Sequence, residues 1–336
     1  MTNKILAIRF SAFGDVIIAH HVICALLEQN PDLEILFLTK PFFAQLFKDI
    51  PRLETIHFSK DFDGLLGLWR LKKYLKKNWN FSIIIDIHNS LRSNILKFYF
   101  LFGKKIFSFS KGKKEKRQLT RKKNKLLKPL KHTAERYCEA FRKAGFNCNL
   151  ANYKPSRNYS IFLPKDLPFN NQAKIVGIAP FAKHKQKTYP IELTEQVIKK
   201  LSQNFYVLIF GGGEKELKIA QKWEKQFQNV FSVIGKYNIF EEIALIDRTF
   251  AFITMDSANM HLASLTKTNI ISIWGATHPY LGFYPLYGYQ EKLTIGIDLP
   301  CRPCSVFGNK KCHRGDLACL YRISPDLIVN KVKQLL

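Results

Sequence analysis

Short apolar runs recur along the chain, and most of them are followed by a turn and an amphipathic segment. The runs at 5–10, 34–39 and 81–88 predict buried strands in the first half of the chain. Those at 175–180 and 270–274 predict strands in the second half. Because strand and helix patterns alternate, we predict an α/β protein built from parallel sheets that are covered by helices.

The periodicity is lost between Tyr153 and Asn171, where Pro155, Pro164 and Pro168 interrupt the chain. Prolines and irregular spacing of this kind indicate a linker. A length of 336 residues is sufficient for two domains that each bury a core. We therefore predict domains at 1–155 and 174–322, a linker at 156–173, and a final helix at 323–336 that packs back toward the first domain.

The N-terminus enters a strand pattern directly, without the features of a signal peptide. The longest apolar stretch, at 95–102, is interrupted by Lys97 and falls short of the ~20 residues that span a bilayer. We expect a cytoplasmic protein.

Basic residues exceed acidic ones by 53 to 26, a net charge of +27. Between Lys104 and Lys131 there are 13 Lys and Arg and one acid, Glu115. Such a concentration attracts polyanions, such as nucleic acid, anionic lipid headgroups or a phosphorylated glycolipid. The segment lacks the interleaved aromatic residues of a single-strand nucleic-acid platform, so no specific nucleic-acid partner is expected. A merely solvated basic surface is the alternative.

The stretch from Ala251 to Pro279 reads as strand, turn, helix and strand. Asp256 and Ser257 follow the first strand, a helical pattern runs from Ser257 through Met260 and His261, and Gly275 follows the second strand. In parallel sheets, ligands bind at the carboxyl ends of the strands. The amino end of a helix there suits a phosphate. This pattern predicts a phosphate or nucleotide pocket.

Three glycines, among them Gly212, follow the apolar run that begins at 205. A glycine cluster after a parallel strand is consistent with nucleotide binding, although tight turns also use glycine. We expect Glu214 or Glu216 to bind the ribose of the nucleotide, and the sequence does not decide between them.

Four cysteines lie close together near the end of the chain, at Cys301, Cys304, Cys312 and Cys319. Four such thiols have the composition of a structural zinc site. Reduced thiols or labile disulfides are the alternative, since a cytoplasmic location disfavours stable disulfides.

Two segments carry a resemblance to a known family. The string Asp256-Ser257-x-x-Met260-His261-x-Ala263, followed by Gly275-Ala276-Thr277-x-Pro279, resembles the donor-site signature of glycosyltransferase family 9, which contains the lipopolysaccharide heptosyltransferases. The family usually has Gly where this chain has Ala258. Near the N-terminus, Arg9-Phe10-Ser11-x-x-Gly14-Asp15 resembles the family's opening motif.

The resemblance implies a GT-B fold, with two Rossmann-like domains facing across a cleft. It implies an inverting, metal-independent transferase that moves heptose from ADP-heptose to the lipopolysaccharide inner core. Asp15 would be the general base, whereas a cap of the following helix is the structural alternative. The piece Lys187-x-Tyr189-Pro190 resembles the family's phosphate-binding Lys-x-Trp-Pro, although Lys183 and Lys185 could replace Lys187 physically.

The expected site residues follow from these motifs. The donor would contact Lys187, Gly212, Glu214 or Glu216, Asp256, Ser257, Met260, His261 and Gly275. The acceptor, a phosphorylated glycolipid, would contact Ser11, Arg92, Lys113, Lys114, Arg117 and Arg121. We expect a peripheral location at the inner face of the cytoplasmic membrane.

Three alternative functions stay open. The first is a family 9 transferase that uses another nucleotide sugar. The second is a non-enzymatic basic protein that binds nucleic acid or glycolipid, and the third is an inactive donor-binding scaffold.

Overall fold

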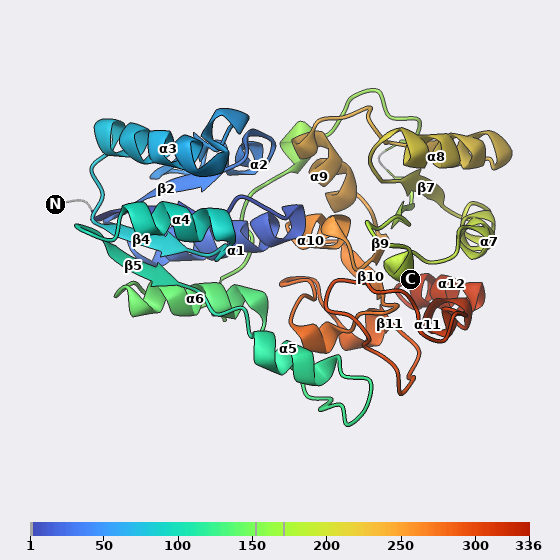
Figure 1. Cartoon of the computed structure of the whole chain (residues 1–336). Coiled ribbons are helices and arrows are strands. Elements are labelled where there is room, and N and C mark those ends of the chain that lie inside the picture. The colour runs from blue at the N-terminus through green and yellow to red at the C-terminus, as the bar shows by residue number, and fades with distance from the viewer. Residues whose placement is uncertain (1–2, 152, 171) are drawn as a thin grey trace. The chain divides into compact units, whose positions relative to one another are not determined.

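The computed structural model describes residues 3–151, 153–170 and 172–336 (Figure 1). The contacts within the chain divide it into two compact units. The first unit comprises Met1–Gly112 and Lys131–Lys154, and the second comprises Lys113–Leu130 and Pro155–Leu336.

The first unit is built on a parallel sheet with the strand order β3-β2-β1-β4-β5. Its strands are β1 (Asn3–Ile8), β2 (Leu33–Thr39), β3 (Leu53–His57), β4 (Ile83–Asp86) and β5 (Lys105–Ser108). Its α-helices are α1 (Phe13–Gln29), α2 (Pro41–Ala44), α3 (Gly64–Asn78), α4 (Leu91–Tyr99) and α6 (Thr133–Lys143).

The central strands β1 and β4 are buried on both faces, which explains the apolar runs that mark them in the sequence. Leu6 and Ile8 of β1 pack with Leu71 of α3 and Leu96 of α4 in one core. The residues between them in β1 are buried as well and point to the opposite face, because side chains alternate along a strand. On that face α1 packs against α6.

The second unit is built on a parallel sheet with the order β11-β10-β9-β6-β7-β8. Its strands are β6 (Ile175–Ala179), β7 (Tyr206–Ile209), β8 (Val230–Ser232), β9 (Ala251–Met255), β10 (Asn269–Ile273) and β11 (Thr294–Ile295). Its α-helices are α5 (Lys113–Leu119), α7 (Ile191–Leu201), α8 (Glu214–Gln226), α9 (Ile239–Asp247), α10 (Ala258–Ala263), α11 (Ala318–Tyr321) and α12 (Pro325–Lys333).

The core of the second unit joins α7, α8 and α12 to one face of its sheet. Ile328, Val329 and Val332 of α12 are buried there, and α12 packs against α7 and β10. The structure therefore assigns α12 to the second unit, and contact of its other face with the N-terminal domain stays a prediction. The apolar face of α12 is already used within the second unit.

In each sheet the strand order reverses between two adjacent central strands, β1 and β4 in the first unit and β6 and β9 in the second. The connections on either side of such a pair run to opposite faces of the sheet. A crevice at the carboxyl ends of the two strands is the usual ligand site of this architecture. The topology therefore indicates that a ligand would bind at the loops after β1, β4, β6 and β9.

The basic segment 104–131 is divided between the two units, which differs from the predicted domain 1–155. β5 belongs to the first sheet, whereas α5 and the chain up to Leu130 pack in the second unit. Lys125 donates to the carbonyl of Pro303 (2.8 Å), and the amide of Leu130 donates to the carbonyl of Tyr280 (2.8 Å). We call residues 113–130 the basic arm.

Among the described residues, no helix combines the length and the apolar character that crossing a membrane requires.

Leu71 on α3 tests the packing of the first core. Its side chain is fully buried, whereas Leu66 on the same helix is 78% exposed. We expect Leu71→Ala to cost about 2–5 kcal/mol of the free energy of unfolding, and Leu66→Ala to change it by less than about 0.5 kcal/mol. Urea unfolding followed by circular dichroism measures both, and equal effects would contradict this description of the core.

Candidate active site

Asp15 lies in the first turn of α1, the helix that follows the loop after β1. Its carboxylate pairs with the Arg9 guanidinium (Nη2 to Oδ2, 2.7 Å) and accepts a hydrogen bond from the Tyr137 hydroxyl (3.2 Å). Arg9 is itself held by the carbonyl of Ile87 (2.6 Å). The Asp15 side chain is 24% exposed. A carboxylate accepts about four hydrogen bonds, so this one is fixed in orientation and still able to accept a proton from solvent or substrate.

The loop after β4 adds a second set of charged groups beside Asp15. Asp86, at the end of β4, is fully buried, pairs with Lys97 (2.8 Å), and accepts the amides of His88 (2.9 Å) and Asn89 (2.7 Å). Burial, and then the positive charge of Arg9, lowers the pKa of His88 to about 4. The His88 imidazole is therefore neutral at neutral pH.

The sequence had led us to expect no binding or catalytic role for four residues of this cluster, namely Arg9, Asp86, His88 and Tyr137. Asp86 and His88 carried a usable signal, because they lie at the carboxyl end of a strand that its apolar run predicts. Tyr137 carried none, since it reaches Asp15 from a position 122 residues further along the chain.

In the second unit, Lys187, Asp256 and Thr277 form one cluster from three loops. The Lys187 ammonium lies 3.0 Å from Asp256 Oδ2, and the Thr277 hydroxyl donates to the same oxygen (2.7 Å). Lys187 ends η4 (Lys185–Lys187) in the loop after β6, Asp256 follows β9, and Thr277 lies in the loop after β10. Lys187 is largely enclosed, with 15% of its side chain exposed, whereas Lys183 and Lys185 are exposed.

Gly275 allows these loops to approach each other. A Cβ at Gly275 would lie 2.5 Å from the carbonyl oxygen of Gln186. That carbonyl accepts the amide of Ala276 (3.0 Å), which ties η4 to the loop after β10. The buried Arg302 donates to the carbonyls of Gly275 (2.8 Å) and Thr277 (3.2 Å). Gly275 therefore has a close-packing role at this position.

The contacts of the glycine cluster distinguish Glu216 from Glu214, the two candidates for binding the ribose. Gly212 donates its amide to Glu216 (2.7 Å), so the Glu216 carboxylate lies at the carboxyl end of β7. Burial raises the pKa of Glu216. Glu214 pairs instead with Lys218 on the exposed surface of α8 (2.8 Å).

Helix α10 is short and ends at Ala263. The hydroxyls of Ser264 and Thr266 donate to the carbonyls of His261 (2.6 Å) and Ala263 (2.8 Å), so these side chains compete for the helical acceptors. Met260 and His261 are buried in the second unit. Ser257, the residue before α10, has a buried hydroxyl that forms no hydrogen bond with any residue that the structure describes.

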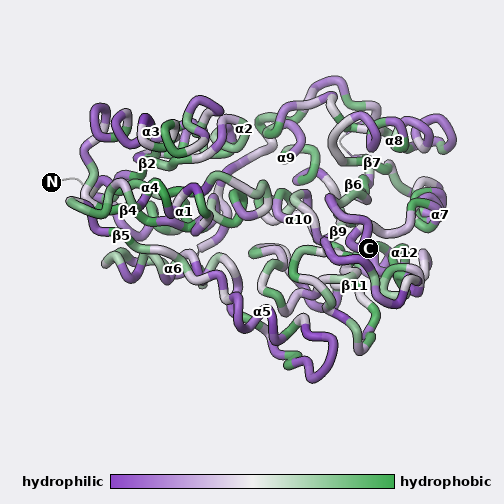
Figure 2. The backbone as a smooth tube through the Cα atoms, in the orientation of Figure 1, coloured by the Kyte–Doolittle hydropathy of each residue, from purple (hydrophilic) through white to green (hydrophobic). Residues whose placement is uncertain are grey.

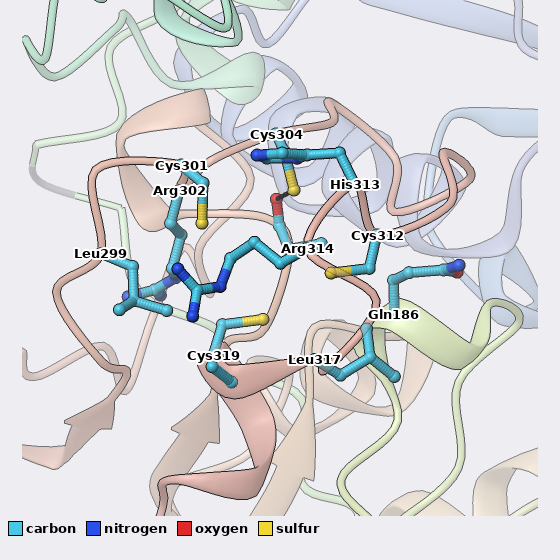
Figure 3. A pocket seen from close by; sticks show the side chains of 12 residues that line it. Gln186, Leu299, Cys301, Arg302, Cys304, Cys312, His313, Arg314, Leu317 and Cys319 are labelled. Carbon is cyan, nitrogen blue, oxygen red and sulfur yellow. Dashed lines mark hydrogen bonds between the residues drawn. The ribbon is translucent and has the colours of Figure 1, made fainter.

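The four tail cysteines line one small cavity of about 10 Å³, together with Gln186, Ala276, Arg302 and Arg314 (Figure 3). All four are free thiols, and burial raises the pKa of Cys319 to about 11. No group of three Cys, His, Asp or Glu residues within the described ranges is arranged to hold a metal ion. Zinc binding stays a prediction from the spacing.

The cysteine segment also contacts the Lys187 cluster. The amide of Cys304 donates to the carbonyl of Ala276 (3.0 Å). A Cβ at Gly308 would lie 2.4 Å from Lys187 Cγ, so the lysine stem rests against this glycine. The segment therefore helps to hold Lys187 in place.

The expected acceptor residues are distributed over both units. Ser11 lies in the loop between β1 and α1, close in sequence to Asp15. Arg92 forms an exposed ion pair with Asp63 (2.8 Å) at the start of α3. The remaining four belong to the second unit with the basic arm, namely Lys113, Lys114, Arg117 and Arg121.

Solved structures share this fold over nearly the whole chain. A glycosyltransferase family 9 structure from Veillonella parvula is 16% identical with a TM-score of 0.74, and covers 99% of this chain and 97% of its own. The structure of the E. coli ADP-heptose LPS heptosyltransferase II is 17% identical with a TM-score of 0.71, covering 99% and 98%. The protein thus has the GT-B fold, with two parallel-sheet α/β domains.

The sequence comparison gives the family. The family model for glycosyltransferase family 9 (heptosyltransferase) matches residues 68–313. The chain therefore belongs to glycosyltransferase family 9. A Campylobacter jejuni lipooligosaccharide heptosyltransferase 2 is 30% identical over 177 residues, which is 50% of this chain and 54% of that protein. The chain thus matches about half the length of this curated relative.

His88 makes the free energy of unfolding depend on pH in a measurable way. Its pKa is about 4 in the folded protein and about 6.5 in an unfolded chain. Between these values the unfolded chain binds a proton that the folded protein does not, so His88 makes stability fall as the pH decreases from about 6.5 toward 4. We expect urea midpoints at pH 7 and pH 5 to differ less in His88→Gln than in the wild type. An equal difference in both proteins would contradict the neutral state of His88 in the folded protein.

Proposed function

We propose that this protein is an inverting glycosyltransferase that moves heptose from ADP-heptose to an inner-core acceptor of lipopolysaccharide. The observation that carries the proposal is the pair of charged clusters at the two topological switch points, in a chain that belongs to family 9. The cluster around Lys187 suits a diphosphate, and the cluster around Asp15 suits proton transfer.

The donor part of the proposal uses the second unit. The Lys187 ammonium would contact the donor phosphates, and its enclosed position favours it over the exposed Lys183 and Lys185. The buried Ser257 hydroxyl is available to a phosphate oxygen or a sugar hydroxyl. Glu216, at the carboxyl end of β7, would bind the ribose. The relative described as an ADP-heptose transferase supports the choice of donor.

The catalytic part uses Asp15. Its carboxylate would take the proton of an acceptor hydroxyl while that oxygen attacks the anomeric carbon of the heptose. The bond from the anomeric carbon to the diphosphate oxygen breaks, ADP leaves, and the configuration at the anomeric carbon inverts. Arg9 and Tyr137 would hold the carboxylate in line, and Lys187 would stabilise the charge that develops on the diphosphate.

The acceptor would be a phosphorylated glycolipid. Ser11 lies close in sequence to Asp15, and the basic arm supplies positive charge for acceptor phosphates through Lys113, Lys114, Arg117 and Arg121. Such a substrate resides in a membrane. We therefore propose a peripheral location at the inner face of the cytoplasmic membrane, with electrostatic attraction to anionic lipid.

Asp15→Asn tests the general base. The amide cannot take the proton, so we expect turnover with ADP-heptose and a heptose-acceptor glycolipid to fall about 10²- to 10⁴-fold. ADP affinity should stay within about twofold of the wild type. Mass spectrometry of the product measures turnover, and calorimetry measures ADP binding. Asp32→Asn, at an exposed position of the same unit, is the matched control. Substantial turnover in Asp15→Asn would exclude this role.

Lys187→Ala tests the phosphate contact. Loss of a charged hydrogen bond to the diphosphate should raise the dissociation constant of ADP about tenfold to a hundredfold. Lys183→Ala and Lys185→Ala are the matched controls, because they remove exposed lysines of the same loop. If one of these controls weakens ADP binding and Lys187→Ala does not, the phosphate contact belongs to that lysine.

A further inference from the structure

Helices α3 and α4 cover their sheet with one face each and leave large apolar side chains on the other. Eight of the sixteen exposed large hydrophobic residues in the described ranges lie on these helices or directly after α4. They are Leu65, Leu66, Trp69, Tyr74, Leu91, Phe98, Leu101 and Phe102. Phe102 is the most exposed of them, at 94%.

These side chains form one surface because the two helices pack against each other. The Tyr99 hydroxyl on α4 donates to the carbonyl of Leu65 on α3 (3.3 Å). The Phe98 and Tyr99 rings are neighbours, with centroids 6.4 Å apart. On α4, Leu91 and Phe98 are two helical turns apart and therefore lie on one side, and Leu101 and Phe102 follow the helix directly. We call the eight exposed residues the apolar surface of the first unit.

The same helices carry a high density of positive charge. α3 contains Arg70, Lys72, Lys73, Lys76 and Lys77 and no acidic residue. The Lys73 ammonium lies over the Trp69 ring, 3.7 Å from its centroid, so charge and aromatic surface are adjacent. Figure 2 shows hydrophobic and hydrophilic residues alternating along α3. Burial, and then the charge of Lys76, lowers the pKa of Lys104, which indicates that Lys104 lies close to the basic end of α3.

We propose that the apolar surface of α3 and α4 is the site at which this protein docks on anionic phospholipid. Aromatic and aliphatic side chains would enter the boundary between headgroups and acyl chains, and the lysines beside them would contact the phosphates. The inference deepens the proposed membrane location and rests on it. Vesicle binding is nevertheless measured independently of glycosyl transfer.

Charge complementarity favours a lipid over a second copy of this chain. A twofold contact would place the lysine-rich α3 helices of two molecules with a net charge of +27 against each other. Anionic headgroups remove this repulsion, and they match a surface in which basic and apolar groups lie side by side.

The test is co-sedimentation of the full chain with vesicles of phosphatidylglycerol and phosphatidylcholine, and with vesicles of phosphatidylcholine alone. We expect binding to the anionic vesicles only, weakened at about 1 M salt, where charges are screened within about 3 Å. The charge variant Lys73→Gln, Lys76→Gln, Lys77→Gln should bind on the order of a hundredfold more weakly, at about fivefold per lysine. The apolar variant Leu66→Ser, Phe98→Ser, Phe102→Ser should also lose binding.

Matched controls change similar residues on the second unit. Lys215→Gln, Lys225→Gln, Lys292→Gln removes the same charge from exposed positions, and Ile161→Ser, Phe307→Ser, Leu336→Ser removes exposed apolar groups. Both controls should bind like the wild type, and thermal unfolding checks that every variant is folded.

Three outcomes would overturn the proposal. The first is an absence of wild-type binding to anionic vesicles at low salt, and the second is equal loss of binding in the surface and control variants. The third is a dimer, seen by light scattering, that the apolar variant dissolves while lipid binding is unchanged. None of these bears on turnover with a soluble acceptor, so failure here is distinct from failure of the proposed reaction.

Discussion

The reversal of strand order in each sheet is the constraint on which both candidate clusters depend. At β1 and β4, and again at β6 and β9, adjacent strands send their connections to opposite faces. The loops after these strands therefore meet at an edge that no crossover helix fills. This brings Arg9 within 2.6 Å of the carbonyl of Ile87, and Lys187 within 3.0 Å of Asp256, although each pair is about 70 to 80 residues apart in the chain.

The two ion pairs at these edges, Arg9 with Asp15 and Lys187 with Asp256, are poor candidates for purely structural roles. Removing charges from water costs free energy that the attraction between the partners only partly offsets, so a buried ion pair is weak evidence for stability. Arg9 is 5% exposed, and Asp256 is 7% exposed. Their positions agree with the proposed function, in which each pair would hold a charged group in one orientation for a substrate charge or proton.

The basic residues of the chain occupy several different environments in the structure. Lys187 is enclosed by its own loops and by Gly308 of the cysteine segment. The basic arm packs in the second unit, where Lys125 and Leu130 hold it by hydrogen bonds to Pro303 and Tyr280. The lysines of α3 remain on the surface beside exposed apolar groups. Net charge alone could not distinguish these roles, because it does not record which lysines are buried, paired or adjacent to apolar surface.

The sequence by itself determined most of the parallel strands, because strands that are buried on both faces have continuous apolar runs. It also placed Asp256 and Gly275 directly after such runs, and Asp15 at the start of the helix that follows the first run. It missed β5, which lies inside the basic segment and contains only two apolar residues, Ile106 and Phe107. Only the tertiary structure decided that Tyr137 holds Asp15, that Glu216 rather than Glu214 turns toward Gly212, and that the basic arm and α12 belong to the second unit. These contacts join positions that no local periodicity relates, so they exist only once the chain has folded and burial has selected the partners.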